Sequence, residues 1–398
     1  MYILSIIINT TWEQRKANYI FNSVTDKGYP ELPVLSASQE LGMVYRDQNG
    51  IDIQHDKKNE TSYKRVLPGQ FVIHLRSFQG GFAYSEVEGI TSPAYTVMSF
   101  KNSSEQYGLF WKHVFKSETF IKRLETITYG IRDGRSISFS DFKSLILQYP
   151  SFSEQKLIGG SIEIIESGIT LHQRKLDNLK LKKKALLQKL FPKNGERYPE
   201  LRFPGFTDAW EQRKLSDIST KVTTKNVDVH YTETLTNSAQ QGIISQVDFF
   251  DKEISNKDNI NGYYIVDNND FIYNPRISTL APVGPINRNK LNRTGIMSPL
   301  YTVFRSSNVD LGFLEWYFQS SHWHRYMKLN GDSGARADRI AIKDSTFFEM
   351  PIKIPVNIKE QVLIGETLEK FNQYITLHQR KLEHLKLQKK ALLQQMFV

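Results

Sequence analysis

Apolar residues recur at alternating steps of three and four in two long stretches of the chain, residues 158–190 and 368–396. A seven-residue apolar repeat of this length predicts an α-helix with a narrow apolar seam, and such a seam requires a partner helix. The residues that we expect to form the helix-pair interface are Ile162, Ile165, Ile169, Leu176, Leu179 and Leu186 in the first helix, and Leu368, Phe371, Ile375, Leu382, Leu385 and Leu392 in the second.

The two helical stretches are nearly identical in sequence. Residues 169–188 read ITLHQRKLDNLKLKKKALLQ, and residues 375–394 read ITLHQRKLEHLKLQKKALLQ. Lys183 and Lys389 occupy the same seam position, so a parallel, in-register pair would bury lysine against lysine. An antiparallel pair sets each lysine against Leu or Ile and lets its side chain extend outward. We therefore favour an antiparallel pair within one chain; the alternatives are a seam between two copies of the chain or one edge of a larger bundle.

The repeat extends beyond the helices. The pentapeptide WEQRK at residues 12–16 returns at residues 210–214, and SPAYTV at 92–97 returns as SPLYTV at 298–303. The offset between matched segments varies from 198 to 206 positions, which indicates insertions or deletions in loops. The chain is therefore one domain with one helix, duplicated in tandem. Between the matched segments the two halves differ strongly, as expected for one scaffold that carries two different surfaces.

Each half carries signals of both strands and short helices. Short apolar runs at residues 70–75 and 270–273 follow turn residues and predict strands, as do residues 94–100 and 300–304. Residues 109–123 and 311–329 carry aromatic residues at helical spacing. We interpret these aromatic residues as core-facing, with a base-stacking platform as the alternative.

These patterns predict an α+β fold: two tandem mixed α/β domains, each followed by a long helix, with the two helices pairing as an antiparallel coiled coil. The expected boundaries are 1–151 for the first domain, 152–191 for the first helix, 192–206 for a linker, 207–357 for the second domain and 358–398 for the second helix. The linker is assigned from its prolines, glycines and charged residues.

Composition narrows the choice of partner. The net charge of +10 favours an anionic partner, with nucleic acid first and a membrane surface second. The chain has no cysteine, which excludes disulfides and thiolate metal sites and fits a reducing compartment. The apolar run Ile3–Ile8 is too short to span a membrane and lacks the basic residues that begin a secretory signal, so we expect a cytoplasmic protein.

Known catalytic motifs are missing from the sequence. There is no G-x-x-x-x-G-K-[ST] phosphate loop and no G-x-G-x-x-G cofactor loop after a strand. Asn274-Pro275-Arg276 is not the Asn-Pro-Pro-aromatic motif of adenine methyltransferases. The histidines and carboxylates show no spacing typical of a metal or nuclease site, so we expect neither a metal nor a catalytic residue in this chain.

Basic residues in variable loops are the candidates for DNA contact. An arginine side chain can donate two hydrogen bonds to guanine, an Asn or Gln amide can form two with adenine, and a lysine can contact phosphate. The candidates are Lys64, Arg65, Arg76, Arg132 and Arg135 in the first half, and Arg276, Arg288, Lys290, Arg293, Arg336 and Arg339 in the second. Each of them could instead take part in a surface salt bridge. The basic residues on the first helix could be solvated, follow phosphates or dock an acidic partner.

The sequence resembles a known family, the DNA-specificity subunits of type I restriction–modification enzymes. The residues that carry the resemblance are PELRFPGFTDAWEQRKL at 199–215, Glu154-Gln155 and Glu360-Gln361 before the helices, and the helix ends KALLQKLFP and KALLQQMFV. The resemblance covers the whole chain in its order of variable half, helix, variable half, helix. One departure is that residues 1–11 lack the PELRFPGF segment that precedes Trp210.

The resemblance implies that each half is a target-recognition domain that reads one part of a split, asymmetric double-stranded DNA site. It implies two antiparallel helices that set the gap between those parts. It also implies two modification (methyltransferase) subunits, which dock on the helices and recognition domains and methylate adenine, and two restriction (motor-nuclease) subunits, which join for cleavage. S-adenosylmethionine, ATP and Mg²⁺ would belong to these partners.

Helix length agrees with such a spacing role. A helix from residue 154 to 190 is roughly 55 Å long at 1.5 Å per residue, which exceeds one DNA turn of roughly 34 Å. Two other functions remain open: a coiled-coil scaffold with weak, non-specific DNA binding, and a stand-alone nuclease or methyltransferase with an unfamiliar site. A preference for one split DNA site would argue against the scaffold.

Overall fold

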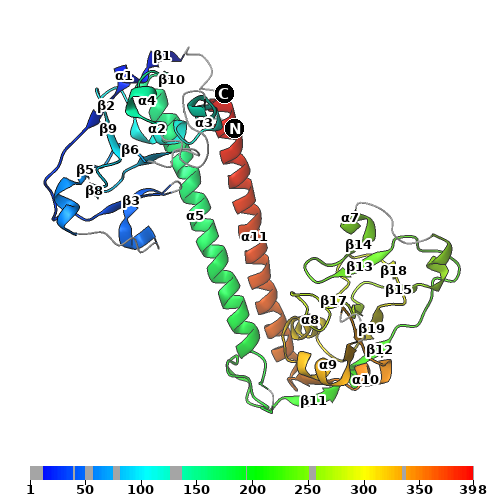
Figure 1. Cartoon of the computed structure of the whole chain (residues 1–398). Coiled ribbons are helices and arrows are strands. Elements are labelled where there is room, and N and C mark those ends of the chain that lie inside the picture. Colours follow the sequence, from blue (N-terminus) through cyan, green and yellow to red (C-terminus); the bar gives the residue numbers. More distant parts are fainter. Residues whose placement is uncertain are drawn as a thin grey trace. The chain divides into compact units, whose positions relative to one another are not determined.

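The computed structural model describes residues 12–38, 41–49, 57–74, 81–125, 137–193, 195–250, 257–333 and 338–397. The apolar run Ile3–Ile8 lies outside these residues. The chain forms two compact units: unit 1 consists of residues 1–173 and 380–398, and unit 2 of residues 174–379. The long helices α5 (Phe152–Lys189) and α11 (Ile358–Met396) both cross the boundary, so each unit contains a segment of each helix (Figure 1).

Unit 1 contains a four-stranded antiparallel sheet and three further two-stranded antiparallel pairs among its described residues. The sheet order is β2 (Phe21–Val24), β9 (Thr96–Phe100), β6 (Phe71–Ile73), β7 (Phe82–Tyr84). The further pairs are β1 (Glu13–Lys16) with β10 (Ile146–Tyr149), β3 (Leu35–Ser38) with β4 (Gly42–Tyr45), and β5 (Lys64–Val66) with β8 (Gly89–Thr91). The short helices are α1 (Ala17–Ile20), α2 (Gly108–Val114), α3 (Glu118–Glu125) and α4 (Phe139–Phe142), with 3₁₀ helices η1 (Arg46–Asn49) and η2 (Lys57–Ser62).

Unit 2 repeats these elements in the same order. Its sheet order is β12 (Ser219–Lys221), β19 (Thr302–Ser306), β16 (Phe271–Tyr273), β17 (Ile286–Arg288). The further pairs are β11 (Glu211–Lys214) with β22 (Pro351–Ile354), β13 (Leu235–Ser238) with β14 (Gly242–Ser245), β15 (Tyr264–Val266) with β18 (Gly295–Met297), and β20 (Asp332–Ser333) with β21 (Ile340–Ala341). Its short helices are α6 (Leu215–Ile218), α7 (Gln246–Phe250), α8 (Leu311–Gln319), α9 (His324–Asn330) and α10 (Asp344–Phe348), with the 3₁₀ helix η4 (Lys257–Gly262).

The predicted fold class, two similar mixed α/β domains with long helices, is confirmed by this shared topology. The predicted strands correspond to β6, β9, β16 and β19. Each predicted aromatic helix is instead two helices, α2 with α3 and α8 with α9. Serines explain both breaks: the Ser117 hydroxyl accepts a hydrogen bond from the Phe120 amide at the start of α3, and Ser320 is extended at the end of α8.

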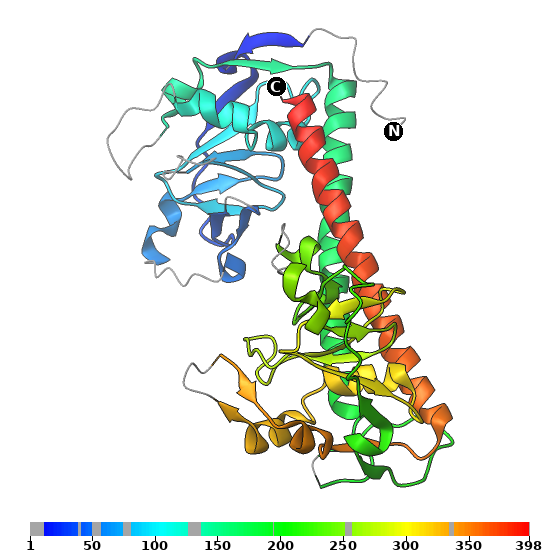
Figure 2. The ribbon, with the colours of Figure 1, turned by 90° about the vertical axis from the view of Figure 1, so that its right-hand side faces the viewer.

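The core of unit 1 is aromatic and draws on both long helices. Phe110, Trp111 and Phe115 are buried, which confirms that the aromatic residues of this stretch face the core. Ile158 and Ile162 of α5 join this core, and so do Met396 and Phe397 at the end of α11. The Phe397 ring centroid lies 5.8 Å from that of Phe110 and 6.4 Å from that of Trp12. Figure 2 shows the C-terminal end of α11 beside α5 within this unit.

The core of unit 2 is built in the same way, but here the start of α11 and the end of α5 contribute the side chains. Ile364 and Leu368 come from α11, while Leu190 and Phe191 follow the end of α5. The Phe191 ring lies 5.6 Å from Phe313 and 6.1 Å from Trp210. Each core therefore needs side chains from the start of one long helix and from the end of the other.

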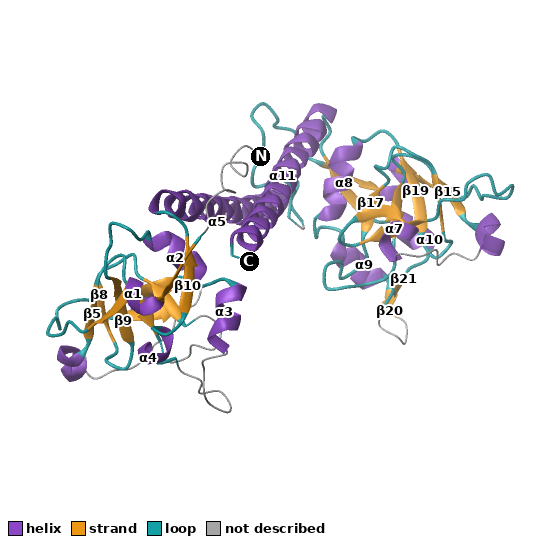
Figure 3. Cartoon of the chain, turned by 90° about the horizontal axis from the view of Figure 1, so that it is seen from above, coloured by secondary structure: helices purple, strands orange, loops and turns teal. Residues whose placement is uncertain are grey.

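Two matched glycines let the short helices pack closely on the long ones. A Cβ at Gly159 would lie 2.7 Å from the backbone nitrogen of Phe110, and a Cβ at Gly365 would lie 2.9 Å from that of Phe313. Both distances are too short for a real side chain, so α2 rests on α5, and α8 rests on α11, at backbone contact distance. Figure 3 shows α8 lying between α11 and strand β17.

Segments of α5 and α11 run antiparallel in both units. In unit 1 the Lys389 ammonium pairs with Glu166 at 2.6 Å, and Gly168 lies against Leu385. In unit 2 the Lys183 ammonium donates a hydrogen bond of 2.8 Å to Asn372 Oδ1, and Leu186 and Leu190 pack in the cluster that contains Ile364 and Leu368. All twelve predicted interface residues are buried or half-buried.

The prediction for the surroundings of the seam lysines Lys183 and Lys389 is wrong in one respect. Each was expected to lie against Leu or Ile, but Lys389 meets the Glu166 carboxylate, and Lys183 meets the Asn372 amide and the face of Trp316, 4.5 Å from the ring centroid. The physical reason is that a half-buried ammonium needs a hydrogen-bond acceptor or a ring face when it cannot reach water.

The segment before the second domain completes a buried ion pair. Arg202 donates two hydrogen bonds of 2.8 Å to Glu360, whose side chain is 1% exposed, and the Trp210 indole N–H donates to the same carboxylate at 3.4 Å. In unit 1 the Trp12 indole N–H donates to Glu154 in the matching way, at 3.4 Å. Arg202 belongs to the PELRFPGF segment, which has no counterpart before Trp12.

Among the described residues no helix is long and apolar enough to span a membrane.

We expect Arg202→Ala to destabilise unit 2 by about 3–5 kcal/mol, because it leaves the buried Glu360 carboxylate without its cation. Urea unfolding followed by tryptophan fluorescence would measure this loss. Arg197→Ala, which removes an exposed arginine from the same segment, serves as the control. A loss below about 1 kcal/mol for Arg202→Ala would show that the pair behaves as an exposed one and would contradict the assignment.

Candidate nucleic-acid interface

The structure separates the predicted DNA-contacting residues into three groups. Arg76, Arg132, Arg135 and Arg336 lie outside the described residues. Lys64, Arg65, Arg288, Lys290 and Arg293 form hydrogen bonds or ion pairs within their own unit. Arg276 and Arg339 are exposed and lie next to each other.

The two described candidates of unit 1 are engaged within the domain. Lys64 donates to the Tyr95 carbonyl oxygen at 2.6 Å, and burial, together with nearby Lys27, lowers the pKa of its ammonium. The Arg65 guanidinium forms a 2.5 Å ion pair with Glu88 and lies 4.5 Å from the ring centroid of Tyr29. Both side chains thus stabilise the strand pair β5–β8 and its surroundings.

Three candidates of unit 2 are matched by carboxylates. Arg288 and Lys290 both pair with Glu315, at 2.7 Å and 3.1 Å, and Lys290 also lies 3.4 Å from Glu369 of α11. Arg293 pairs with Glu233 at 2.7 Å. These contacts tie the end of β17 and the loop after it to α8, to α11 and to the segment before β13, so much of the charge of this group is balanced inside the unit.

Arg276 and Arg339 are brought together by an antiparallel bridge between two short extended segments. The Ile277 amide donates to the Asp338 carbonyl oxygen at 2.9 Å, and the Ile340 amide donates to that of Pro275 at 2.9 Å. The two guanidinium groups have no ion pair with any of the described residues. Exposed and opposite each other in this bridge, the two residues place two positive charges on the surface of unit 2.

These two arginines border an open cavity of about 370 Å³. Polar residues that line it include Asn237, Ser238, Gln240, Asn274 and Tyr301. Guanidiniums and the Gln240 amide on one concave surface are groups that can read base edges, whereas the Asn237 amide is occupied by buried hydrogen bonds. No sequence pattern marks these amides as candidates, although Asn274 lies only two residues before Arg276.

Buried hydrogen bonds hold the wall of this cavity in place. Asn237 is 2% exposed and donates to the carbonyl oxygens of Ile272 and Pro285, at 2.7 Å and 3.2 Å. Its own Oδ1 accepts from Asn287 at 2.7 Å, and its carbonyl oxygen accepts from Asn274 at 2.9 Å. Gly284 has a positive φ of 82°, and a Cβ there would overlap the Asn274 carbonyl oxygen.

The matching region of unit 1 differs in chemistry. In the repeat, His74 and Tyr95 correspond to Asn274 and Tyr301 of unit 2. The ring centroids of His74 and Tyr95 lie 6.2 Å apart. Burial lowers the pKa of His74, so the imidazole is held neutral. The residues that follow, 75–80, lie outside the described part of the chain. The two units therefore carry different polar groups, His74 and Asn274, at one equivalent position beside an equivalent tyrosine.

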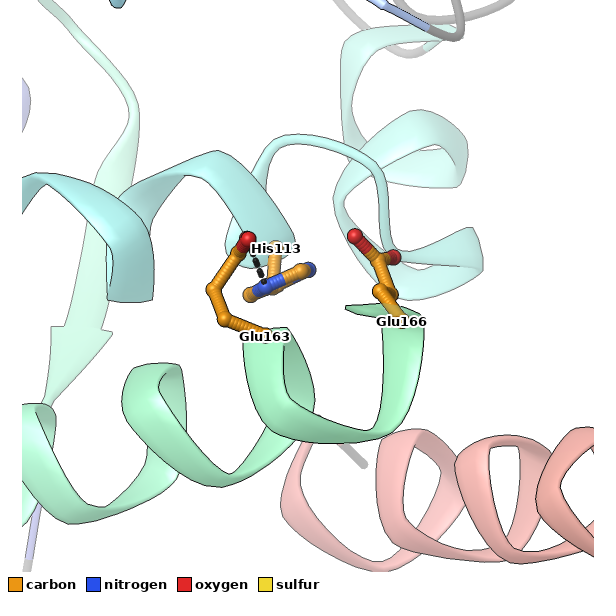
Figure 4. Close-up of side chains that lie close together, drawn as sticks. All are labelled: His113, Glu163 and Glu166. Atoms are coloured by element: carbon orange, nitrogen blue, oxygen red, sulfur yellow. Dashed lines mark ion pairs between the residues drawn. The ribbon is translucent and has the colours of Figure 1, made fainter. Parts of the chain in front are cut away.

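One group of potential metal ligands lies elsewhere in unit 1, at the junction of α2 and α5. His113, Glu163 and Glu166 bring their ligand atoms within 4.8 Å of one another (Figure 4). His113 Nε2 lies 3.0 Å from Glu163, Lys112 lies 2.8 Å from Glu163, and Lys389 lies 2.6 Å from Glu166. The lysines already balance both carboxylates, so we interpret this group as an ion-pair cluster that joins α2, α5 and α11.

Unit 2 replaces this cluster with different residues at the same junction. Trp316 and Asn372 stand where unit 1 has His113 and Glu166, and both contact Lys183. Burial lowers the pKa of the Lys183 ammonium, and Glu369 and Glu315 partly oppose that effect. The two units therefore hold equivalent lysines by different means.

Comparisons with known proteins bear on the fold. No protein-family model matches the sequence, and the comparison with curated proteins gives no match. The structure is similar to the crystal structure of the type I restriction–modification system S subunit from M. genitalium, with a TM-score of 0.57 and 12% identity over 98% of this chain and 97% of that chain. This likeness shows that the chain has the S-subunit fold over nearly its whole length.

Two other solved structures align over a similar extent. The HsdS subunit from Thermoanaerobacter tengcongensis aligns with a TM-score of 0.46 and 14% identity over 97% of this chain and 96% of that one. A chain from a structure of the type I R-M system aligns with a TM-score of 0.44 and 15% identity over 98% of both chains.

We expect Glu163→Gln to remove an acid-sensitive part of the stability of unit 1. The close contact with the His113 ring, 3.0 Å from Nε2, with help from Lys112, lowers the pKa of Glu163 to about 2 from its ordinary value of 4.5. A lowered pKa adds stability that is complete above about pH 4.5 and is lost as the pH falls toward 2. The melting temperatures of wild type and variant should therefore differ at neutral pH and converge as the pH falls below 4.5.

Glu86→Gln is the matched control, because Glu86 also pairs with Lys112 but is 65% exposed. Its melting temperature should stay close to that of wild type at every pH. A difference in melting temperature between wild type and Glu163→Gln that does not change with pH would contradict the ion-pair interpretation.

Proposed function

We propose that this chain is the DNA-recognition subunit of a type I restriction–modification complex. In this proposal each unit reads one part of a bipartite, asymmetric DNA site, and partner subunits methylate adenine and cleave. The observation that carries the proposal is the construction of the chain: two domains of one topology present different polar surfaces and share one pair of helices. The S-subunit fold over 98% of the chain supports it.

The reading surface that we propose for unit 2 is centred on Arg276 and Arg339. Both residues are exposed, lie opposite each other in an antiparallel bridge and form no ion pair with a described carboxylate, so in this proposal they contact guanine or phosphate. Gln240 lines the same cavity and suits adenine, whereas the Asn274 amide already donates to the Asn237 carbonyl oxygen and accepts from the Arg276 backbone amide. Lys290 and Arg293 are weaker candidates for DNA contact in this proposal, because each already forms an ion pair with a carboxylate of the same unit.

The chemistry in this proposal belongs to partner subunits. The chain itself is proposed to be non-catalytic and to work in the cytoplasm. Two modification subunits would bind S-adenosylmethionine, and two restriction subunits would bind ATP and Mg²⁺. This chain would supply sequence recognition and spacing, and its net charge of +10 would favour association with DNA.

The proposed spacer is the antiparallel pair of α5 and α11. These helices have 38 and 39 residues, which corresponds to roughly 57–59 Å at 1.5 Å per residue. A coiled-coil scaffold would use the same helices, but it would not require a different polar surface on each domain. The difference between the His74 and Asn274 regions therefore favours recognition over scaffolding.

Methylome sequencing tests the proposal directly. The chain would be co-expressed with its methyltransferase partner in a host without other methyltransferases. We expect methylated adenines at one split sequence with two defined parts and a fixed gap, and no methylation from this chain alone. Methylation without the partner, or methylation without sequence preference, would overturn the proposal; the second outcome would favour the scaffold.

The same assay assigns the unit 2 surface. Arg276→Ala with Arg339→Ala should relax or abolish recognition of one half-site and leave the other half-site unchanged. Arg293→Ala, which removes an arginine already paired with Glu233, is the matched control and should retain both half-sites.

Lengthening the helix pair should change the gap and leave the half-sites unchanged. Insertion of one heptad after Gln173 and another after Gln379 keeps the seam in phase, because the two positions are equivalent in the repeat. Seven residues add roughly 10.5 Å, or about three base pairs. The methylome of this variant should show the original half-sites with a longer gap, whereas an unchanged gap would exclude the helices as the spacer.

A further inference from the structure

Large apolar side chains border the cavity beside Arg276 and Arg339. They are 41% to 70% exposed, and none of them belongs to a hydrophobic core of unit 2. Exposed apolar side chains that gather around one cavity are typical of a binding surface. We call the following four residues the apolar rim: Phe249 and Phe250 of α7, Leu280 of the loop between β16 and β17, and Leu300, two residues before β19.

Hydrogen bonds hold the backbone that carries the apolar rim. α7 lies beside β13 and β14 (Figure 1), and its first amide donates to the Thr234 carbonyl oxygen at 2.8 Å. The ring centroids of Phe249 and Phe250 are 4.6 Å apart, and the two rings are nearly perpendicular. In the loop between β16 and β17, the backbones of Ser278 and Ala281 exchange hydrogen bonds of 3.0 Å and 3.1 Å. The rim residues therefore have defined positions although their side chains reach solvent.

Unit 1 carries different residues at rim positions of the repeat. β4 and η2 match β14 and η4 at an offset of 200 positions, so Asn49 corresponds to Phe249. The segments SPAYTV and SPLYTV match Ala94 with Leu300. A surface for a partner that binds both units alike would be expected in both copies of the repeat. The rim instead belongs to the surface in which the two units differ, which is where a sequence-reading surface is expected.

The chemistry around the cavity limits what can occupy it. Arg276 and Arg339 are exposed and form no ion pair with a described carboxylate, so they favour an anionic partner such as DNA. DNA phosphates would gain nothing from the apolar rim. Among the groups that base pairs present in the major groove, the apolar one is the C5-methyl group of thymine, which phenylalanine and other apolar side chains contact. Phenylalanine and leucine beside two arginines therefore fit a thymine next to a guanine or a phosphate.

We propose that the apolar rim reads a thymine in the half-site of unit 2 through the C5-methyl group of that base. This inference rests on the proposed function and adds to it the kind of base that unit 2 selects. Contact with the rim removes the methyl group from water, and a base without this group loses the contact. Arg276 and Arg339 position the duplex by contacting guanine or phosphate beside the thymine.

Replacement of thymine by uracil tests the inference, because it deletes the methyl group and keeps the base pair. The full-length chain, in complex with the methyltransferase subunit, would bind duplexes that carry the split site found by methylome sequencing. Each thymine of both half-sites would be replaced in turn, and fluorescence anisotropy at one fixed salt concentration would give the Kd. For wild type we expect one replacement to weaken binding roughly 4-fold, the effect of removing one methyl group from an apolar contact.

Two variants show whether the apolar rim makes this contact. Leu280→Ala with Leu300→Ala changes the two most exposed rim residues, and Phe249→Ala with Phe250→Ala changes the two on α7. Circular dichroism should show an unchanged fold for both. In at least one of them the roughly 4-fold effect of that uracil should disappear, because thymine and uracil then lack the same contact. The effects of uracil in the other half-site should equal those in wild type.

Leu329→Ala is the matched control, because Leu329 is 73% exposed on α9 of the same unit but lies outside the cavity. This variant should bind DNA and respond to uracil as wild type does.

Three outcomes would show that the inference is wrong while the proposed function stands. The first is that no uracil replacement weakens binding by wild type. The second is that the effects of uracil are the same in wild type and in both rim variants. The third is that the rim variants release the methyltransferase subunit, which would make the rim a protein contact. If wild type shows no preference for a split site, both the inference and the proposed function are wrong.

Discussion

The fold depends on cores that are completed by side chains from distant parts of the chain. Phe397, next to the C-terminus, packs against Trp12 and Phe110, and Phe191 packs against Trp210 and Phe313. A buried aromatic side chain contributes roughly 3–5 kcal/mol, a large part of the stability of a typical domain. Because the end of one helix completes the domain that precedes the other helix, neither helix can be displaced along its partner without opening a core. Burial of the seam residues holds the two helices together, and the aromatic side chains at the helix ends fix the register of one helix against the other.

This arrangement separates the parts that must stay constant from the parts that can differ. Each long helix contributes a segment to both units, so its sequence must suit the packing of both cores. In the described part of the chain, the hydrogen bonds between the segments around Arg276 and Arg339 join residues of the same domain, so these segments can change without disturbing the seam. The sequence shows the same division, since the helices are nearly identical and the loops between matched segments are not.

Much of the fold could be predicted from the sequence, because its strongest signals are local. The three-and-four spacing identifies the seam, and the tandem repeat identifies two domains of one kind. The ion pairs of the candidate site could not be predicted. Arg65 meets Glu88, Arg288 meets Glu315 and Arg293 meets Glu233, partners 23 to 60 positions away. A basic residue in a loop looks the same in the sequence whether a carboxylate holds it or not. The cavity beside Arg276 depends on Asn237 and Gly284, which only the folded chain brings together.

The two lysines show how one helix sequence can serve two different domains. Lys183 and Lys389 occupy the same position in the repeat, yet one lies over Trp316 beside Asn372, and the other pairs with Glu166 near His113. An ammonium group has three rotatable donors and a flexible stem, so an amide, a carboxylate or a ring face can each satisfy it. A planar guanidinium would demand a more specific geometry from both domains. Lysine at this seam position therefore lets each domain build its own contact with the helices while the helices remain the same.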